Sequence, residues 1–257
     1  MLLCINANNT NVKFAVYDND KPVGDWRLKT EAARTADQYV VWLDQLMRMS
    51  GLELKRINAA IIASVVPASL FHLTMLCEHH LKTKPLVVGD PAVKLGIQVK
   101  MDIPTATVGA DRLANAVGGH ITYKKPLIIV DFGTATTFDV ADGEGNYLGG
   151  AISPGINLSV EILHSATAML PRIAIERPQR VIGKSTTEAM QSGIFWGYVG
   201  LVEGMVQRIT SEFGQELAVI ATGGLAPLFV GVTPLIHHLD PDITMRGLVE
   251  IYRRNRA

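Results

Sequence analysis

One pattern of residues occurs twice in this chain, and this internal repeat constrains the fold more than any other feature of the sequence. Residues 5–17 (INANNTNVKFAVY) and residues 130–142 (VDFGTATTFDVAD) each continue a short apolar run. In each copy an Asn or Asp residue, Asn6 or Asp131, leads into a turn of small residues, and a second β-rich stretch follows and ends in another turn. Internal similarity is the mark of duplicated architecture, so we expect a β-hairpin at the head of each half of the chain.

Helical and strand-like segments follow each hairpin, which is typical of an α/β protein. In the first half, Thr35 and Gln38 have the spacing of a capping box and open an amphipathic stretch that ends near Met49. Further segments are strand-like at 59–65, 85–89 and 216–224, and helical around 68–82, 156–169, 186–213 and 243–255. We therefore predict an α/β fold of two similar domains, residues 1–110 and 111–257, with no flexible linker between them.

Charge and hydropathy exclude several classes of function. The 24 basic and 24 acidic side chains cancel, so we expect neither nucleic acid nor an anionic membrane as a partner. No stretch approaches the roughly 18 uncharged apolar residues of a membrane helix, and the N-terminal residues do not resemble a secretory signal. Cys4 and Cys77 lack metal-binding or redox spacing, so we expect both to be reduced and buried. These features predict a cytoplasmic protein that binds a small molecule or another protein.

The two hairpin turns suit a polyphosphate. Backbone N–H groups in tight turns form concavities that bind anions, and a neighbouring carboxylate can organise a cation. Either turn alone is also typical of an ordinary hairpin, because such turns commonly use Gly, Asn and Thr. The repetition favours phosphate binding. Neither turn is a Walker A sequence, and no Rossmann fingerprint follows a strand.

Two further motifs carry candidate chemistry. In VIATGGLA (219–226) an apolar strand ends in Gly223 and Gly224, where backbone can approach a purine or a phosphate closely, although an ordinary strand-to-helix turn has the same form. Gly109-Ala110-Asp111-Arg112 opens a helix. Its Asp could simply cap that helix. Asp beside Arg also supplies a base and an anion clamp, which are the side chains that phosphoryl transfer needs.

Taken together, the motifs resemble those of the type III pantothenate kinases. The shared segments are NNTN near residue 10, GADR at 109–112, DFGTATTFDV at 131–140, YLGGAISPGI at 147–156, EAMQSGIFWGYVGLVEG at 188–204 and ATGG at 221–224. The resemblance implies two similar ribonuclease H-like domains of the actin-like ATPase type, with a nucleotide cleft between them, in a homodimer. It also implies transfer of the ATP γ-phosphate to pantothenate, which gives 4′-phosphopantothenate in the first step of coenzyme A biosynthesis.

The resemblance implies roles for individual residues as well. Asp111 would be the catalytic proton acceptor, and pantothenate would be held by Gly109, Ala110, Asp111, Arg112 and Thr186. Asp131 would bind a monovalent cation, K⁺ or NH₄⁺, and Thr134 would contact ATP, which carries Mg²⁺. The first phosphate turn would consist of Asn6, Ala7, Asn8, Asn9, Thr10, Asn11, Val12 and Lys13, and Gly223 and Gly224 are predicted to approach the nucleotide.

The first turn departs from the pattern of these kinases, which normally reads Asp-x-Gly-Asn-Thr. Here Asn6 and Asn8 replace the Asp and the Gly. An amide keeps an oxygen but lacks the negative charge by which hard cations are largely held. Two alternatives therefore stand beside the active kinase: a catalytically impaired regulator that binds nucleotide or pantothenate, and a transcription-linked accessory protein on the same fold.

Overall fold

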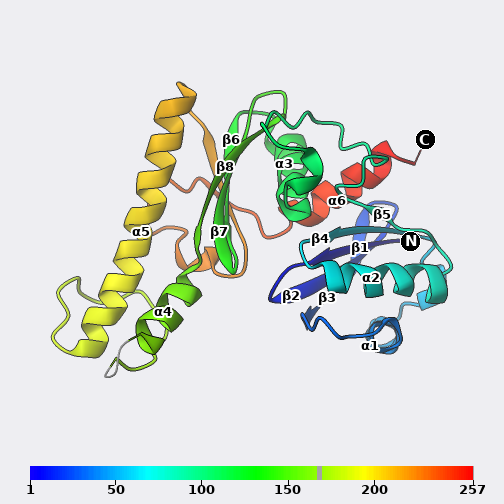
Figure 1. Ribbon diagram of the computed structural model, residues 1–257, viewed down its shortest axis with the longest axis horizontal. Coiled ribbons are helices and arrows are strands. Elements are labelled where there is room, and N and C mark those ends of the chain that lie inside the picture. Colours follow the sequence, from blue (N-terminus) through cyan, green and yellow to red (C-terminus); the bar gives the residue numbers. More distant parts are fainter. Residues whose placement is uncertain (167–169, 257) are drawn as a thin grey trace. The chain divides into compact units, whose positions relative to one another are not determined.

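The computed structural model describes residues 1–166 and 170–256, which form two compact units (Figure 1). Unit 1 consists of Met1–Thr122 together with Asp242–Ala257, and unit 2 consists of Tyr123–Pro241. Within the described residues each unit contains one five-stranded sheet. The predicted α/β class with two similar domains is therefore confirmed.

The sheet of unit 1 is built from the first hairpin and the strands that follow it. Its strand order is β3-β2-β1-β4-β5. The bounds are β1 Leu2–Ala7, β2 Asn11–Asp18, β3 Lys21–Lys29, β4 Ala59–Ser64 and β5 Leu86–Val87. β1 runs antiparallel to β2 and parallel to β4, and β4 runs parallel to β5. β1 and β4 read as nearly continuous apolar runs because central strands are buried on both faces.

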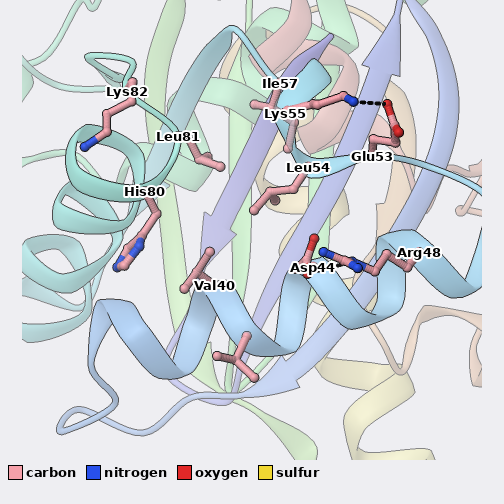
Figure 2. A pocket seen from close by; sticks show the side chains of 11 residues that line it. Val40, Asp44, Arg48, Glu53, Leu54, Lys55, Ile57, His80, Leu81 and Lys82 are labelled. Carbon is pink, nitrogen blue, oxygen red and sulfur yellow. Dashed lines mark ion pairs between the residues drawn. The ribbon is translucent and has the colours of Figure 1, made fainter.

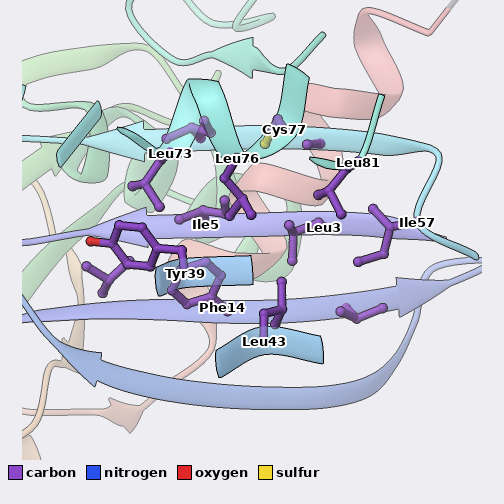
Figure 3. Packing of buried hydrophobic residues seen from close by; sticks show 14 of the residues in the cluster. Leu3, Ile5, Phe14, Tyr39, Leu43, Ile57, Leu73, Leu76, Cys77 and Leu81 are labelled. Carbon is purple, nitrogen blue, oxygen red and sulfur yellow. The ribbon is translucent and has the colours of Figure 1, made fainter. Parts of the chain in front are cut away.

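One face of this sheet is covered by α1 (Ala36–Met49), by α2 (Pro67–Met75) and by the π-helical turn Leu76–His80. α1 begins as predicted, because Thr35 and Gln38 form the reciprocal bonds of a capping box. Figure 3 shows the packing on this face, with strand residues Leu3, Ile5 and Phe14 against helix residues Tyr39, Leu43, Leu73 and Leu76. Since side chains alternate along a strand, Cys4, Asn6 and Lys13 lie on the opposite face.

That opposite face carries α6 (Ile243–Arg254), which packs on β1 and β4 and against α3 (Ala110–Tyr123). The two helices approach at their backbones: a Cβ atom on Gly118 would lie 2.0 Å from the Ile243 carbonyl oxygen, and one on Gly247 would lie 1.9 Å from that of Ala114. The predicted halves were separated at residues 110 and 111, whereas this packing groups α6 and most of α3 with unit 1.

Unit 2 repeats the strand topology of unit 1. The order is β10-β9-β6-β7-β8, with β6 antiparallel to β7 and parallel to β9. The bounds are β6 Leu127–Phe132, β7 Ala135–Ala141, β8 Tyr147–Pro154, β9 Ala218–Thr222 and β10 His238–Leu239. Each sheet therefore has two antiparallel strands on one side of the central strand and two parallel strands on the other, as a duplication requires.

The long helix α5 (Thr186–Phe213) covers one face of the second sheet and has the bounds that the sequence predicts. Phe195 and Tyr198 pack there against Phe132 and Phe229. Burial raises the pKa of Tyr198, whose hydroxyl is hydrogen-bonded to Thr136 of β7. α4 spans Ile156–Ser165, and residues 167–169 of the predicted helix lie outside the described residues.

Cys4 and Cys77 are free and buried, as predicted. Burial raises the pKa of Cys77 to about 12 and also raises the pKa of Cys4, so both thiols are uncharged at neutral pH. Among residues 1–166 and 170–256, no helix combines the length and the apolar character needed to cross a membrane.

Candidate active site

The first predicted phosphate turn joins β1 to β2 in unit 1. Asn6 and Lys13 are direct cross-strand partners, so their side chains lie on the same face of the sheet, which is the face that α6 covers. The other predicted residues of the turn lie between them: Ala7, Asn8, Asn9, Thr10, Asn11 and Val12. Asn9, Thr10 and Asn11 are exposed and so are open to a ligand.

Thr30, which follows β3, holds the backbone of this turn. Its hydroxyl donates to the Asn8 carbonyl oxygen at 2.6 Å, and its N–H donates to the Thr10 carbonyl oxygen at 2.9 Å. The Asn8 N–H donates to the Asn11 carbonyl oxygen at 3.0 Å. This role of Thr30 was not predicted from the sequence, because β3, the strand that precedes it, was not predicted.

Two amide oxygens of the first turn are buried without a protein partner. Asn6 is 8% exposed, and the Oδ1 atoms of Asn6 and Asn8 accept no hydrogen bond within the described part of the chain. Leaving a buried acceptor unsatisfied costs about 1–3 kcal/mol, so such atoms normally have partners. The turn is therefore suited to a ligand that supplies a cation or a hydrogen-bond donor, and these oxygens fit the Mg²⁺ that accompanies ATP.

Lys13 brings a positive charge to the same turn. Its Nζ lies 3.0 Å from Asp242 Oδ1, at the start of α6, and 3.7 Å from Asp25 Oδ2 on β3. Only 14% of the Lys13 side chain is exposed, so two carboxylates of the same unit fix its ammonium group. The nearby charged groups are thus carried by the strands and by α6, whereas Asn6 is neutral.

The second predicted phosphate turn joins β6 to β7 in unit 2. Asp131 lies near the end of β6 and is half-buried, while Gly133 and Thr134 are exposed in the turn. Gly223 has φ +92°, and a Cβ atom there would lie 2.5 Å from Asp131 Oδ1. Gly224 follows it and is exposed. Unit 2 therefore brings the predicted cation ligand, the predicted ATP contact and the glycine pair to the carboxyl ends of β6 and β9.

Gly155 is a further part of this turn that the sequence did not single out. It caps the start of α4, and its N–H donates to the Thr134 carbonyl oxygen at 3.1 Å. A Cβ atom on Gly155 would lie 2.2 Å from that oxygen, so the close approach requires glycine. In the sequence, the only sign of this role was that Gly155 directly precedes the predicted helix at 156–169.

The GADR segment opens α3 in unit 1. Asp111 is half-buried in the first helical turn, and its Oδ1 accepts the Arg112 N–H at 2.8 Å. A Cβ atom on Gly109 would lie 2.7 Å from that same oxygen, so the glycine leaves room for the carboxylate. Ala110 is buried. Asp111 thus satisfies one N–H of the first helical turn, and this bond is compatible with proton transfer because a carboxylate has two oxygens.

Thr186 is the first residue of α5 and is exposed. The preceding residue, Ser185, caps the helix by accepting the Glu188 N–H at 3.2 Å. The Thr186 hydroxyl is therefore not the N-cap of α5 and is accessible at the start of the helix.

Comparison with known proteins identifies the family. The family model for type III pantothenate kinase matches residues 2–208. A protein of Paramagnetospirillum magneticum named type III pantothenate kinase is 61% identical over 255 residues, which cover 99% of this chain and 98% of the relative. A protein of the same name from Rhodospirillum rubrum is 59% identical and is covered to 99% of its length.

The chain belongs to the type III pantothenate kinase family. Among solved structures, a protein assigned as a 2-dehydro-3-deoxygalactonokinase from Sinorhizobium meliloti is similar with a TM-score of 0.63 and 10% identity, covering 99% of this chain and 96% of that one. At this identity the likeness shows the fold alone. That fold has the two similar α/β units seen in this chain.

In this type III pantothenate kinase the two predicted phosphate turns occupy equivalent positions in their sheets but differ chemically. Asn6 and Asp131 are each the fifth residue of the central strand of a sheet. Each pairs with the parallel strand beside it, Asn6 with Ala63 and Asp131 with Thr222. The fold therefore holds an amide at the position where the other unit holds a carboxylate.

A separate hollow of about 790 Å³ lies on unit 1 beside α1 (Figure 2). Val40, Leu54, Ile57 and Leu81 contribute apolar side chains, and its charged residues include the ion pairs Asp44–Arg48 at 2.8 Å and Glu53–Lys55 at 3.3 Å. It contains none of the predicted site residues and lies with α1, on the other face of the sheet from Asn6. We assign the candidate site residues to the two turns, because the first holds the unsatisfied oxygens of Asn6 and Asn8 and the second brings Asp131 beside Gly223.

Proposed function

We propose that this chain transfers the γ-phosphate of ATP to the primary hydroxyl of pantothenate and so forms 4′-phosphopantothenate, in the first step of coenzyme A biosynthesis. The observation that carries the proposal is the 61% identity, over nearly the full length of both chains, to a relative named for this activity. The glycine-lined turn at Asp131 and the unsatisfied oxygens of Asn6 and Asn8 support it, because the turn lets a polyphosphate approach its backbone and the oxygens suit the Mg²⁺ that accompanies ATP.

In this proposal the two turns bind the triphosphate. The first turn contributes residues 6–13, including the ammonium group of Lys13. The second contributes Thr134 and its backbone, and Gly223 and Gly224 let backbone approach the nucleotide closely. Mg²⁺ bound to ATP offsets the charge that spreads over the phosphoryl oxygens during transfer.

Asp111 is proposed to accept the proton of the pantothenate hydroxyl as that oxygen attacks phosphorus. The Arg112 guanidinium beside it offsets negative charge on the transferred group. Gly109 and Ala110 help to hold pantothenate at the start of α3, and Thr186 provides a further hydroxyl contact. These assignments place the base on a helix rather than on a loop, so its position is defined by packing.

Three further properties belong to the proposal. Asp131 holds a monovalent cation, K⁺ or NH₄⁺, close to the phosphates. The active protein is a homodimer. It acts in the cytoplasm on dissolved substrates, with neither nucleic acid nor membrane as a partner, in keeping with its formal net charge of zero.

Two alternatives to an active kinase were considered from the sequence. The neutral first turn was the reason to consider an impaired regulator or a transcription-linked accessory protein. The match of nearly the whole chain to two relatives named as kinases, at 61% and 59% identity, favours an active enzyme instead.

The test is a coupled ADP-release assay with ATP, Mg²⁺, K⁺ and pantothenate, in which mass spectrometry identifies the phosphorylated product. We expect ADP release that requires pantothenate and that falls when Na⁺ replaces K⁺ and NH₄⁺. Binding of ATP or pantothenate without any product would support the regulator and overturn the kinase. Omission of pantothenate is the control for background hydrolysis of ATP.

A further inference from the structure

The chemical difference between an amide and a carboxylate at position 6 has a consequence for how ATP is bound. A carboxylate only accepts hydrogen bonds, so it meets a phosphate oxygen favourably only when a cation lies between them. An amide carries one acceptor and two N–H donors, and a half-turn of the side chain exchanges them. Asn6 can therefore face either a cation or a phosphate oxygen.

The surroundings of Asn6 leave this choice open. Its Oδ1 has no hydrogen-bond partner in the described residues, although the residue is only 8% exposed. Asn8, two residues later in the same turn, also has a buried Oδ1 without a partner. Each of these amides also carries an Nδ2 group with two N–H donors, which a half-turn of the side chain brings to the place of the unpartnered oxygen.

The charges near Asn6 point the same way. Lys13, its cross-strand partner, lies 3.0 Å from Asp242 and 3.7 Å from Asp25, so one ammonium group already lies among two carboxylates. A third carboxylate at position 6 would add negative charge to the turn that the proposed function places against the triphosphate. The neutral amide avoids that repulsion, which is strong for partly buried charges a few ångströms apart.

We propose that Asn6 allows the first turn to bind the triphosphate of ATP directly, through amide N–H donors, so that binding of ATP depends only weakly on a divalent cation. The inference deepens the proposed function, because it rests on this turn facing ATP. It concerns binding, and the transfer step still uses the Mg²⁺ complex.

Titration calorimetry with ATP in excess EDTA, and again in excess Mg²⁺, measures this dependence. For the native chain we expect the two dissociation constants to lie within about tenfold of each other. In Asn6→Asp, metal-free ATP should bind at least about tenfold more weakly, while the affinity for the Mg²⁺ complex changes less. The ratio of the dissociation constant in EDTA to that in Mg²⁺ should therefore rise. An unchanged ratio in Asn6→Asp would overturn the proposal.

Asn19→Asp is the matched control. Asn19 is exposed in the turn at the other end of β2, so the same substitution adds the same charge to the same hairpin. It should leave both dissociation constants at their native values. If it raises the ratio as much as Asn6→Asp does, the effect comes from net charge and the proposal fails.

Asn6→Ala tests the donors without adding charge and does not depend on whether Asn6→Asp folds. Loss of a hydrogen bond to a charged phosphate should weaken metal-free binding by at least about tenfold, and native-like binding by Asn6→Ala would overturn the proposal. ADP release, measured in parallel, separates the two hypotheses. If the Asn6 variants keep the native ratio of dissociation constants while the native chain shows pantothenate-dependent turnover, the inference alone is refuted. If the variants alter the ratio but the native chain shows no turnover, the proposed function alone is refuted.

Discussion

At the scale of single residues, Asp111 has two roles to separate: capping α3 and accepting the proton of the substrate hydroxyl. Asn keeps an oxygen that can accept the Arg112 N–H. It is not a general base. We therefore expect Asp111→Asn to lower kcat by at least about 100-fold, with thermal stability and ATP affinity close to native.

Asp102→Asn provides the comparison for that substitution, because Asp102 is exposed in the segment before α3. It should leave kcat unchanged in the ADP-release assay. ATP affinity of both variants would be measured by calorimetry, which separates a loss of chemistry from a loss of binding. Near-native kcat in Asp111→Asn would remove Asp111 from its proposed role.

At the scale of elements, the sequence predicted those whose apolar pattern is strong. The hairpins at Asn6 and Asp131, the capping box that starts α1 and the bounds of α5 are all present. Gly223 was also predicted as a point of close backbone approach, beside the alternative of an ordinary strand-to-helix turn, and a Cβ atom there would lie 2.5 Å from Asp131 Oδ1. The positions of these residues follow from local pattern.

The strands β3 and β8 were not predicted, for a physical reason. Each lies at the edge of its sheet, and side chains of β3 are exposed or half-exposed throughout. β8 carries adjacent glycines, and Gly150 passes so close to β7 that a Cβ atom would lie 1.8 Å from the Phe138 carbonyl oxygen. Polar edge strands and glycine-rich strands carry little apolar periodicity, so Thr30, which follows β3, could not be placed from sequence, and for Gly155 the only signal was the helical pattern after it.

The contact of α3 with α6 allows a prediction about stability. A Cβ atom on Gly118 would overlap the Ile243 carbonyl oxygen at 2.0 Å, so Gly118→Ala forces the two helices apart. We expect the free energy of unfolding to fall by about 2 kcal/mol or more, since overpacking typically costs 1–3 kcal/mol. Urea unfolding followed by circular dichroism measures it.

Gly200→Ala is the control for that prediction, because a Cβ atom there meets open space on α5. Alanine in a helix is favoured over glycine by about 1 kcal/mol, so this variant should be neutral or more stable. Equal effects at both positions would contradict the close packing of α3 on α6.

At the scale of the whole molecule, the repeat in the sequence predicted two sheets of one topology, and they are observed. It did not predict that α6 belongs with the first sheet. Helical periodicity identifies a buried face but not its partner. The glycines that permit the contact, Gly118 and Gly247, lie 129 residues apart in the chain and have no local signature.

Assembly into a homodimer is the prediction that belongs to this scale. Unit 2 exposes several large apolar side chains, Ile152, Ile162, Val181 and Ile182, and the last is 74% exposed. Val181 and Ile182 shortly precede Thr186, the proposed pantothenate contact.

We expect light scattering to give about twice the chain mass of 27.9 kDa. Ile182→Asp should shift the mass towards the monomer and raise KM for pantothenate, because burying a charge in an interface is costly. Val41→Asp, an equally exposed site on α1 of unit 1, should preserve the dimer, and a monomeric native chain in the assay would contradict the prediction.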